Sequence, residues 1–188
     1  NYEITYPGVW LQNHAPTQTV KLIEPTSWSC HHGVERWRTN CGCTPGATWK
    51  TPLRSGMEKL ADEIDRAYQD FLMPLTQRKW QLRDNYIKVL LGEISLDELF
   101  LRFVPEMLAP EKGAKVGMLL AAQYERQRMF TSCGWFFDNF HRIEPRNNVA
   151  YAAQAVWLTY LASGVDLSSK ARTDLRQVKS WRSGLSAD

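Results

Sequence analysis

Apolar residues recur at steps of three and four along most of the chain, from Met57 to Val178. This spacing places apolar side chains on one face of an α-helix, which can then pack against other helices. With 44% hydrophobic and 23% charged residues, the composition is ordinary for a globular protein. The sequence therefore predicts a mainly α fold, a helical bundle. The clearest apolar face consists of Met57, Leu60, Ala61, Ile64, Ala67, Tyr68, Phe71 and Leu72.

Local signals predict where these helices begin and end. Thr51-Pro52 is a good helix start, and Pro74 should end or bend the helix that follows. A second helix is expected to stop near Gly92. The capping-box pattern of Ser95-Leu96-Asp97-Glu98 predicts another helix start, and Gly164 is expected to be a C-terminal cap. Further helices are expected over residues 115–131, 145–163 and 168–178.

Residues 1–26 lack a helical period. Apolar residues such as Tyr2 and Ile4 alternate there, and Pro7-Gly8 is typical of a turn. We therefore expect an extended N-terminal segment over residues 1–26, followed by a helical accessory domain over residues 27–188. The first residue is an asparagine rather than an initiating methionine, so we expect the chain to be a fragment of a longer protein.

Two segments rich in glycine and serine concentrate tryptophan, cysteine and histidine. The first motif segment, residues 27–43, begins Ser-Trp-Ser-Cys-His-His-Gly-Val-Glu-Arg-Trp and ends Cys-Gly-Cys. The second motif segment, residues 132–138, reads Ser-Cys-Gly-Trp-Phe-Phe-Asp. Together they hold all four cysteines and three of the eight tryptophans. Large aromatic side chains in irregular backbone are either packed down or offered to a ligand, so we expect the two segments to converge on one site.

Tryptophan beside acidic groups and histidine is typical of sugar-binding sites. The indole packs on the apolar face of a pyranose, and the polar groups bond its hydroxyls. The alternative is that these indoles simply cover the core. No pair of carboxylates can be assigned the acid and base roles of glycoside chemistry, so no catalytic residue is predicted. The candidate substrate-binding residues are Trp28, His32, Glu35, Trp37, Trp135 and Asp138.

The cysteine spacing argues against a common zinc site. Ten residues separate Cys30 from Cys41 and one separates Cys41 from Cys43, whereas paired zinc ligands usually have two to four residues between them. We therefore expect reduced thiols that fill loop interiors, with no metal ligand and no cofactor. The alternative is a zinc site drawn from Cys30, Cys41, Cys43 and Cys133, with His31 or His32 as a substitute ligand.

The two motif segments, together with Ile143-Glu144 and the helix after them, resemble a domain of unknown function. That domain is found in bacterial proteins related to glycoside hydrolase family 57, C-terminal to the catalytic barrel. Family 57 enzymes act on α-glucans, and a helical region after their barrel completes the active-site cleft. In the branching enzymes this region carries a Gly-Ser-Trp-Gly…His…Trp loop and a Ser-Asp-Trp loop. Residues 27–37 are similar to the first loop, and residues 132–136 are similar to the second.

The resemblance implies an accessory helical domain that forms part of an α-glucan-binding cleft. The chain alone would not be an enzyme, and its parent would be a glycoside hydrolase or glucanotransferase. The implied partners are the N-terminal catalytic barrel of the same parent chain and a polysaccharide or oligosaccharide. Two alternatives stay open: a scaffold that stabilises the barrel, and a metal-binding or redox-responsive Cys/His domain.

Charge and hydropathy exclude other partners. The formal net charge is only +3, and the basic residues are dispersed among acidic ones, so we expect no nucleic acid partner. The longest apolar run is too short to span a bilayer, so we expect no membrane association. The expected location is cytoplasmic.

Overall fold

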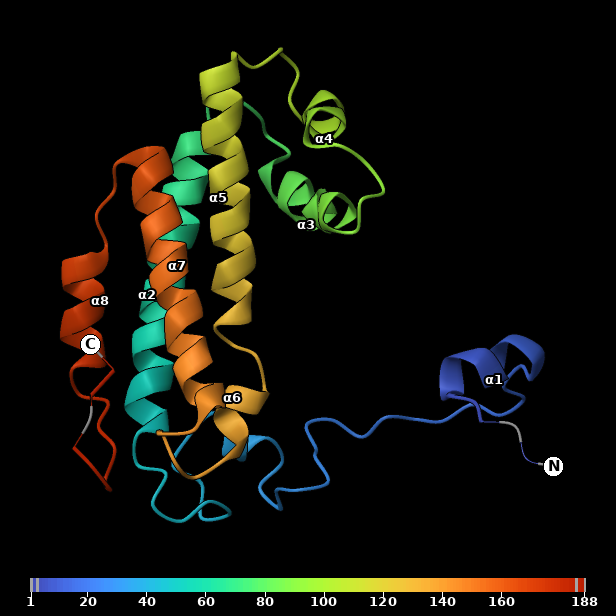
Figure 1. Ribbon diagram of the computed structural model, residues 1–188, viewed down its shortest axis with the longest axis vertical. Helices are drawn as coiled ribbons and strands as arrows, with labels where there is room; N and C mark the ends of the chain where they lie inside the picture. The colour runs from blue at the N-terminus through green and yellow to red at the C-terminus, as the bar shows by residue number, and fades with distance from the viewer. Residues whose placement is uncertain (1, 3, 185, 188) are drawn as a thin grey trace.

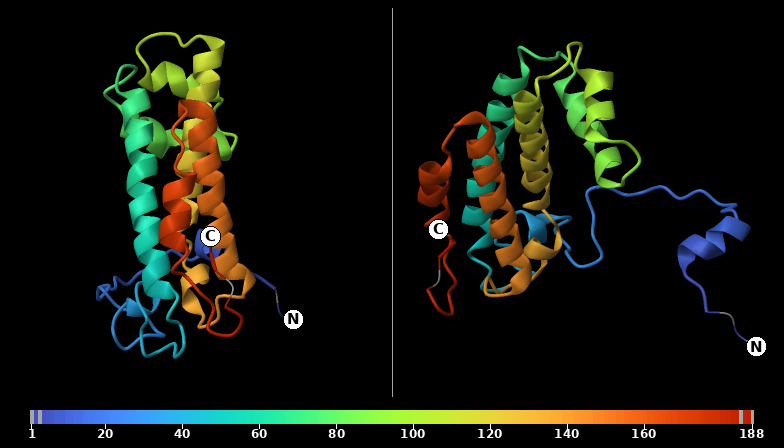
Figure 2. Two further views of the ribbon diagram at one scale, coloured as in Figure 1. Left: turned by 90° about the vertical axis from the view of Figure 1, so that its left-hand side faces the viewer. Right: turned by 45° about the horizontal axis from the view of Figure 1, so that its top comes forward.

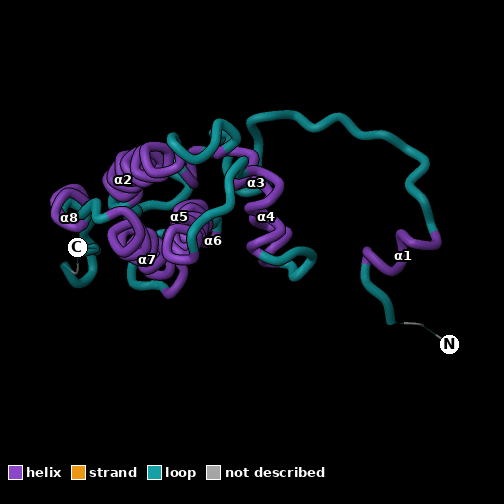
Figure 3. The backbone as a smooth tube through the Cα atoms, turned by 90° about the horizontal axis from the view of Figure 1, so that it is seen from above, coloured by secondary structure: helices purple, strands orange, loops and turns teal. Residues whose placement is uncertain are grey.

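Three long helices form the centre of the molecule: α2 (Lys50–Leu72), α5 (Pro110–Arg128) and α7 (Ile143–Ser163). In the computed structural model, α5 packs along α7 and α2 contacts both of them, as Figure 1 shows. The helix α8 (Ser168–Leu175) packs on α2 and is seen from above at the edge of the bundle (Figure 3). The prediction of a mainly α helical bundle is confirmed.

Shorter elements lie at the two ends of these helices and beyond them. A pair of short helices packs beside one end of α2 and α5, whereas a 3-10 turn and a one-turn helix lie at the other end (Figure 2). The structure describes residues 2, 4–184 and 186–187, and this part contains isolated β-bridges but no strand. The short elements are α1 (Pro7–Asn13), η1 (Glu35–Trp37), α3 (Lys79–Leu90), α4 (Leu96–Phe103) and α6 (Cys133–Phe136).

Two of the predicted helix caps are present, whereas α2 begins at Lys50, before the expected start at Thr51-Pro52. Ser95 Oγ accepts a hydrogen bond from the Glu98 N–H at 3.2 Å, and the Glu98 carboxylate accepts one from the Ser95 N–H at 2.7 Å. Gly164 ends α7 with a φ of 77°, the left-handed conformation that glycine adopts without strain. Pro110 lies in the first turn of α5, where the missing N–H is harmless, so this helix begins five residues before the expected Lys115.

The N-terminal segment departs from the bundle, as Figures 1 and 3 show. Pro7-Gly8 begins the helix α1 rather than a turn, because proline fits the first helical turn. The prediction of extended pieces is therefore wrong for Pro7–Asn13, although most of the described residues before position 27 are irregular. Asn1 and Glu3 lie outside the described residues. Apolar side chains along this segment are exposed, namely Tyr2, Ile4, Tyr6, Trp10, Leu11, Val20, Leu22 and Ile23.

The bundle has two apolar cores stacked along its length. The upper core lies where α3 and α4 cover α2 and α5, and it includes Tyr68, Leu82, Phe100 and Leu120. The lower core lies near the motif segments, where α2, α7 and α8 meet. None of the described helices is long and apolar enough to cross a bilayer. The largest buried side chains of the lower core are Trp49, Leu53, Met57, Ile64 and Trp135.

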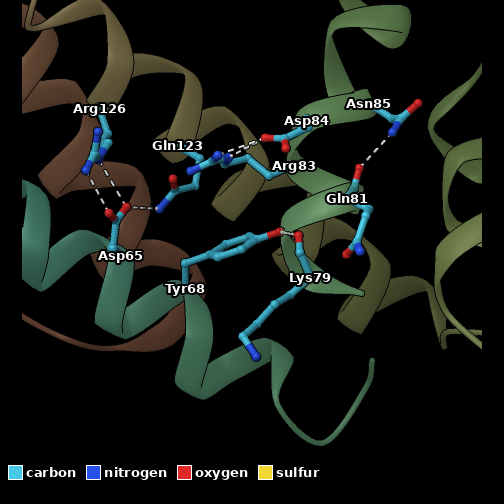
Figure 4. Close-up of polar contacts among 9 residues, drawn as sticks. All are labelled: Asp65, Tyr68, Lys79, Gln81, Arg83, Asp84, Asn85, Gln123 and Arg126. Atoms are coloured by element: carbon cyan, nitrogen blue, oxygen red, sulfur yellow. Dashed lines mark hydrogen bonds and ion pairs between the residues drawn. The ribbon is translucent and has the colours of Figure 1, made fainter. Parts of the chain in front are cut away.

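Polar contacts join α2 to α5 and to α3, and Figure 4 shows them. Asp65 on α2 accepts two hydrogen bonds from the Arg126 guanidinium on α5, at 3.0 and 2.7 Å. The buried side chain of Gln123 donates a third, at 2.9 Å. The Tyr68 hydroxyl donates to the carbonyl of Lys79 at 2.6 Å, which joins α2 to the start of α3. Burial raises the pKa of Tyr68, so this hydroxyl stays a donor.

Candidate functional site

The two motif segments meet at one end of the bundle, as the sequence predicts. The ring centroid of Phe136 in α6 lies 5.9 Å from that of Trp28 and also 5.9 Å from that of Trp37. These contacts join residues that are about a hundred positions apart in the chain. Figure 1 shows α6 beside the lower end of α7, with the blue turn of the first motif segment just beneath it.

An aromatic patch covers this meeting point, and we define it as Trp28, Trp37, Phe136 and Phe137. Trp28 is 89% exposed, whereas Trp37 is half-buried and packs against the lower core. The Phe136 and Phe137 rings meet edge to face at 5.0 Å. Two guanidinium groups lie over these rings, that of Arg36 at 4.6 Å from the Phe136 centroid and that of Arg142 at 3.7 Å from the Phe137 centroid. The patch therefore combines an open indole face with cationic hydrogen-bond donors.

Trp135 is not part of this patch. Only 1% of its surface is exposed, and its ring stacks on Trp49 in the lower core at a centroid distance of 6.3 Å. Gly134 explains the position of α6, because a Cβ there would lie 2.2 Å from the amide nitrogen of Asn148 on α7. The missing side chain at Gly134 therefore allows α6 to lie close against α7. The expectation that Trp135 stacks on a ligand is corrected accordingly.

The two predicted carboxylates come one from each motif segment. Glu35 begins η1, and its carboxylate accepts a hydrogen bond from Thr39 Oγ1 at 3.2 Å. Asp138 follows Phe137 and is partly buried, and its main-chain oxygen accepts a hydrogen bond from Trp49 Nε1 at 2.7 Å. The Glu35 carboxylate also pairs with the exposed Arg38 guanidinium at 3.8 Å, and a carboxylate has acceptor positions left for a hydroxyl group beyond these two contacts.

His32 lies among cysteines rather than in the patch. Its Nδ1 is 3.3 Å from the Sγ of Cys41 and 3.6 Å from that of Cys43. The Sγ atoms of Cys30 and Cys41 are 3.7 Å apart, and all four ligand atoms lie within 4.8 Å of one another. We call Cys30, His32, Cys41 and Cys43 the thiol cluster. Cys133 is not in this cluster; it begins α6 and is exposed.

A buried polar network supports the thiol cluster. The Thr44 hydroxyl and N–H both donate to the carbonyl of Cys41, at 3.3 and 2.9 Å. Arg36 Nη2 donates to the carbonyl of Cys43 at 2.9 Å. The Lys50 ammonium, fully buried in the first turn of α2, donates to Thr44 Oγ1 and to the Arg36 carbonyl. Cationic side chains therefore hold the backbone that carries two of the cysteines.

The protein environment separates the pKa values of the buried groups. Burial by itself would raise the pKa of Cys30, but hydrogen bonds from the main chain of Arg36 and His32 and from the other thiols lower it to about 6. The Cys43 main chain acts to lower the pKa of Cys41, but burial and the neighbouring sulfur atoms raise it above its usual value. Burial, followed by repulsion from Arg36, lowers the pKa of Lys50 to about 8. The cluster thus favours a thiolate at Cys30.

Sequence reasoning missed the residues that organise this site. Phe136 touches both tryptophans of the patch, and its place in the middle of the second motif segment was a signal for it. Lys50 and Thr44 carry no such signal, because their burial is set by how residues 27–48 fold back onto α2. Their role could be found only in three dimensions.

Comparison with known proteins identifies one family. The family model described as "Domain of unknown function (DUF3536)" matches residues 47–186 of the chain. No curated protein matches the chain. No solved structure matches it either. The matched region includes the second motif segment, whereas the thiol cluster lies before it.

Proposed function

The chain belongs to the DUF3536 domain family, and we propose that it is the accessory helical domain of a glycoside hydrolase family 57-like enzyme. In this proposal a neighbouring catalytic barrel in the parent protein performs the reaction. The helical domain forms part of the α-glucan-binding cleft. The motif resemblance supports this proposal, and the observation that carries it is the exposed Trp28 indole at the meeting point of the two motif segments.

The chemistry of the aromatic patch suits a sugar. A large exposed apolar surface is unfavourable in water, and an indole that stacks on the C–H face of a pyranose removes both surfaces from water. Phe136 contacts the Trp28 ring, and the rest of this 89% exposed indole is open to a ligand. Glu35 and Asp138 can accept hydrogen bonds from hydroxyl groups, while Arg36 and Arg142 can donate them.

The predicted set of binding residues becomes smaller in this proposal. Trp28 supplies the stacking face, and Trp37 packs against Phe136, the ring that Trp28 contacts. Glu35 and Asp138 bond hydroxyl groups. Trp135 acts from the core by holding α6 in place. His32 acts through the thiol cluster, which positions the first motif segment.

Titration with maltooligosaccharides tests this proposal, with tryptophan fluorescence as the readout. We expect the chain to bind and Trp28→Ala to abolish the fluorescence change. Trp157→Ala is the matched control, because Trp157 on α7 is also exposed, at 54%, but lies away from the patch. Absence of glucan binding, or equal binding by the two variants, contradicts the proposal. Turnover of starch by the isolated chain, lost in Asp138→Asn, contradicts its accessory role.

A second candidate is a scaffold that stabilises the neighbouring barrel. The exposed apolar side chains of the N-terminal segment favour it, since an apolar surface of this length is commonly covered by another part of a protein. Hydrogen exchange distinguishes the two functions. If the segment packs on a barrel, the amides of residues 4–23 exchange more slowly in the parent protein than in the isolated chain. Equal exchange rates contradict the scaffold.

A further inference from the structure

The thiol cluster has the dimensions of a tetrahedral metal site. With Zn–S bonds of about 2.3 Å and Zn–N bonds of about 2.0–2.1 Å, tetrahedral angles place sulfur atoms about 3.8 Å apart and sulfur and nitrogen about 3.6 Å apart. The Sγ atoms of Cys30 and Cys41 are 3.7 Å apart, and His32 Nδ1 lies 3.3 and 3.6 Å from the Sγ atoms of Cys41 and Cys43. The other ligand atoms lie within 4.8 Å of one another, so a small contraction of the loop brings all four onto one ion. We propose that Cys30, His32, Cys41 and Cys43 bind one zinc ion.

The fold explains why the sequence spacing concealed this site. The ligands come as two pairs, Cys30 with His32 and Cys41 with Cys43, and each pair has one residue between its members. Residues 33–40 between the pairs fold through η1 and bring the second pair back to the first. Gly33, with a φ of 74°, turns the chain directly after His32. The number of residues between two cysteines therefore does not show that the ligands are adjacent in space.

The surrounding charges suit an anionic metal centre. A zinc ion with three thiolates and a neutral imidazole carries a formal charge of minus one. Lys50 is fully buried, and its Nζ bonds only uncharged oxygen atoms in the described part of the chain, those of Arg36 and Thr44. A buried ammonium is costly without an opposite charge. The proposed centre supplies that charge, and Arg36 adds a second cation beside Cys43.

The donor set selects the kind of metal and its role. Thiolates and imidazole are the ligands that zinc prefers in closed tetrahedral sites, and four protein ligands leave no open position for a substrate. The ion would therefore be structural. It would hold the first motif segment in the conformation that places Trp28 and Trp37 on Phe136. Each thiol releases its proton when it binds, so the affinity falls in acid.

Metal content of the full 188-residue chain tests the site directly. We expect roughly one zinc ion per chain after exposure to zinc sulfate under reducing conditions and removal of free metal. Cobalt(II) should bind in its place with the visible absorption of a tetrahedral thiolate centre. Cys41→Ser and His32→Asn should lower zinc affinity by at least about 100-fold. The matched controls, Cys133→Ser and His31→Asn, change the residues outside the cluster and should keep the metal.

A conservative variant keeps the test valid if the ligand variants fold poorly. His32→Cys retains four ligands and should still bind one zinc ion, with a cobalt spectrum shifted by the added thiolate. Wild-type chain that holds no stoichiometric zinc, or that selects iron from an equal mixture of the two, overturns the proposal. Equal zinc retention in Cys41→Ser and Cys133→Ser also overturns it. Because glucan binding is measured separately, this result is independent of the proposed function.

Discussion

The indole N–H of Trp49 donates a hydrogen bond to the main-chain oxygen of Asp138 at 2.7 Å. Trp49 directly precedes α2, and Asp138 ends the second motif segment. The same indole stacks on Trp135 and packs against Phe140. One buried side chain therefore fixes the second motif segment to the start of the longest helix, beside the Lys50 network.

Trp49→Phe should destabilise the protein by about 1–3 kcal/mol, because the substitution keeps an aromatic ring but leaves the Asp138 carbonyl without its donor. Urea unfolding monitored by circular dichroism measures this change. Trp157→Phe is the control and should change stability by less than about 0.5 kcal/mol, since Trp157 lies largely on the surface. Equal effects of the two substitutions would argue against a structural role for the Trp49 bond.

Gly134→Ala should destabilise the protein by about 1–3 kcal/mol through overpacking. The added Cβ would overlap the side-chain amide of Asn148, which also donates to the carbonyl of Thr131 at 3.1 Å. Gly42→Ala is a matched control, because nothing lies within 4 Å of a Cβ at that position. Thermal unfolding of both variants checks the prediction. A Gly134→Ala protein as stable as Gly42→Ala would show that α6 can move away from α7.

Asp65→Asn should cost about 1–3 kcal/mol, because Arg126 loses an ionic partner in a half-buried position. The side chains of Asp65 and Arg126 are only 20% and 23% exposed. The control is Glu111→Gln, which breaks the exposed pair with Lys115 on the surface of α5 and should cost no more than about 1 kcal/mol. Denaturant unfolding of each variant, at low and at high salt, measures both differences.

The sequence predicted the helix ends better than the site. Helix ends depend on residues that are close in the chain, whereas the site depends on contacts between residues that are far apart in it. Capping at Ser95 and Gly164 uses neighbouring residues, so local patterns identify it. Whether an indole is exposed depends on distant residues. Trp28 and Trp135 occur in similar motifs, but only Trp135 finds a buried partner, Trp49, which lies 86 positions away.

The proposed metal site also depends on contacts that local sequence patterns do not reveal. The sequence contained all four ligands, and the zinc alternative included them. The rule that counts residues between paired cysteines argued against it, because that rule describes common zinc loops rather than this fold. The convergence of Cys30, His32 and the Cys41-Gly42-Cys43 pair is created by the turn through η1, which no local pattern predicts.

Lys50→Met should lower zinc affinity by about 10–100-fold, the usual cost of losing a group that supports metal ligands. Methionine fills the space of the lysine stem but removes the positive charge and the bond to Thr44 Oγ1. Competition with a coloured chelator measures the affinity. Lys115→Met on the exposed surface of α5 is the control and should leave the affinity unchanged. Unchanged affinity in Lys50→Met would show that the buried charge does not support the metal.

Removal of zinc should loosen the first motif segment and leave the bundle folded. In the described part of the chain, none of the three cysteine ligands belongs to the two apolar cores, so we expect the helices to stay packed without the metal. We expect trypsin to cut after Arg36 and Arg38 at least about tenfold faster in the chelated protein, because a bound ion stabilises the closed segment in proportion to its affinity. Far-UV circular dichroism should change little.

The digestion carries its own reference site. Lys21 lies in the exposed N-terminal segment, so trypsin should cut after it equally fast with and without zinc. Zinc added back under reducing conditions should restore protection at Arg36 and Arg38, and it should fail to do so in Cys43→Ser. If trypsin cuts after Arg36 and Arg38 at the same rate with and without zinc, then metal binding at the thiol cluster does not order the first motif segment. Loss of helicity on chelation would instead show that the metal supports the whole bundle, because the lower core would then depend on the segment that folds beneath it.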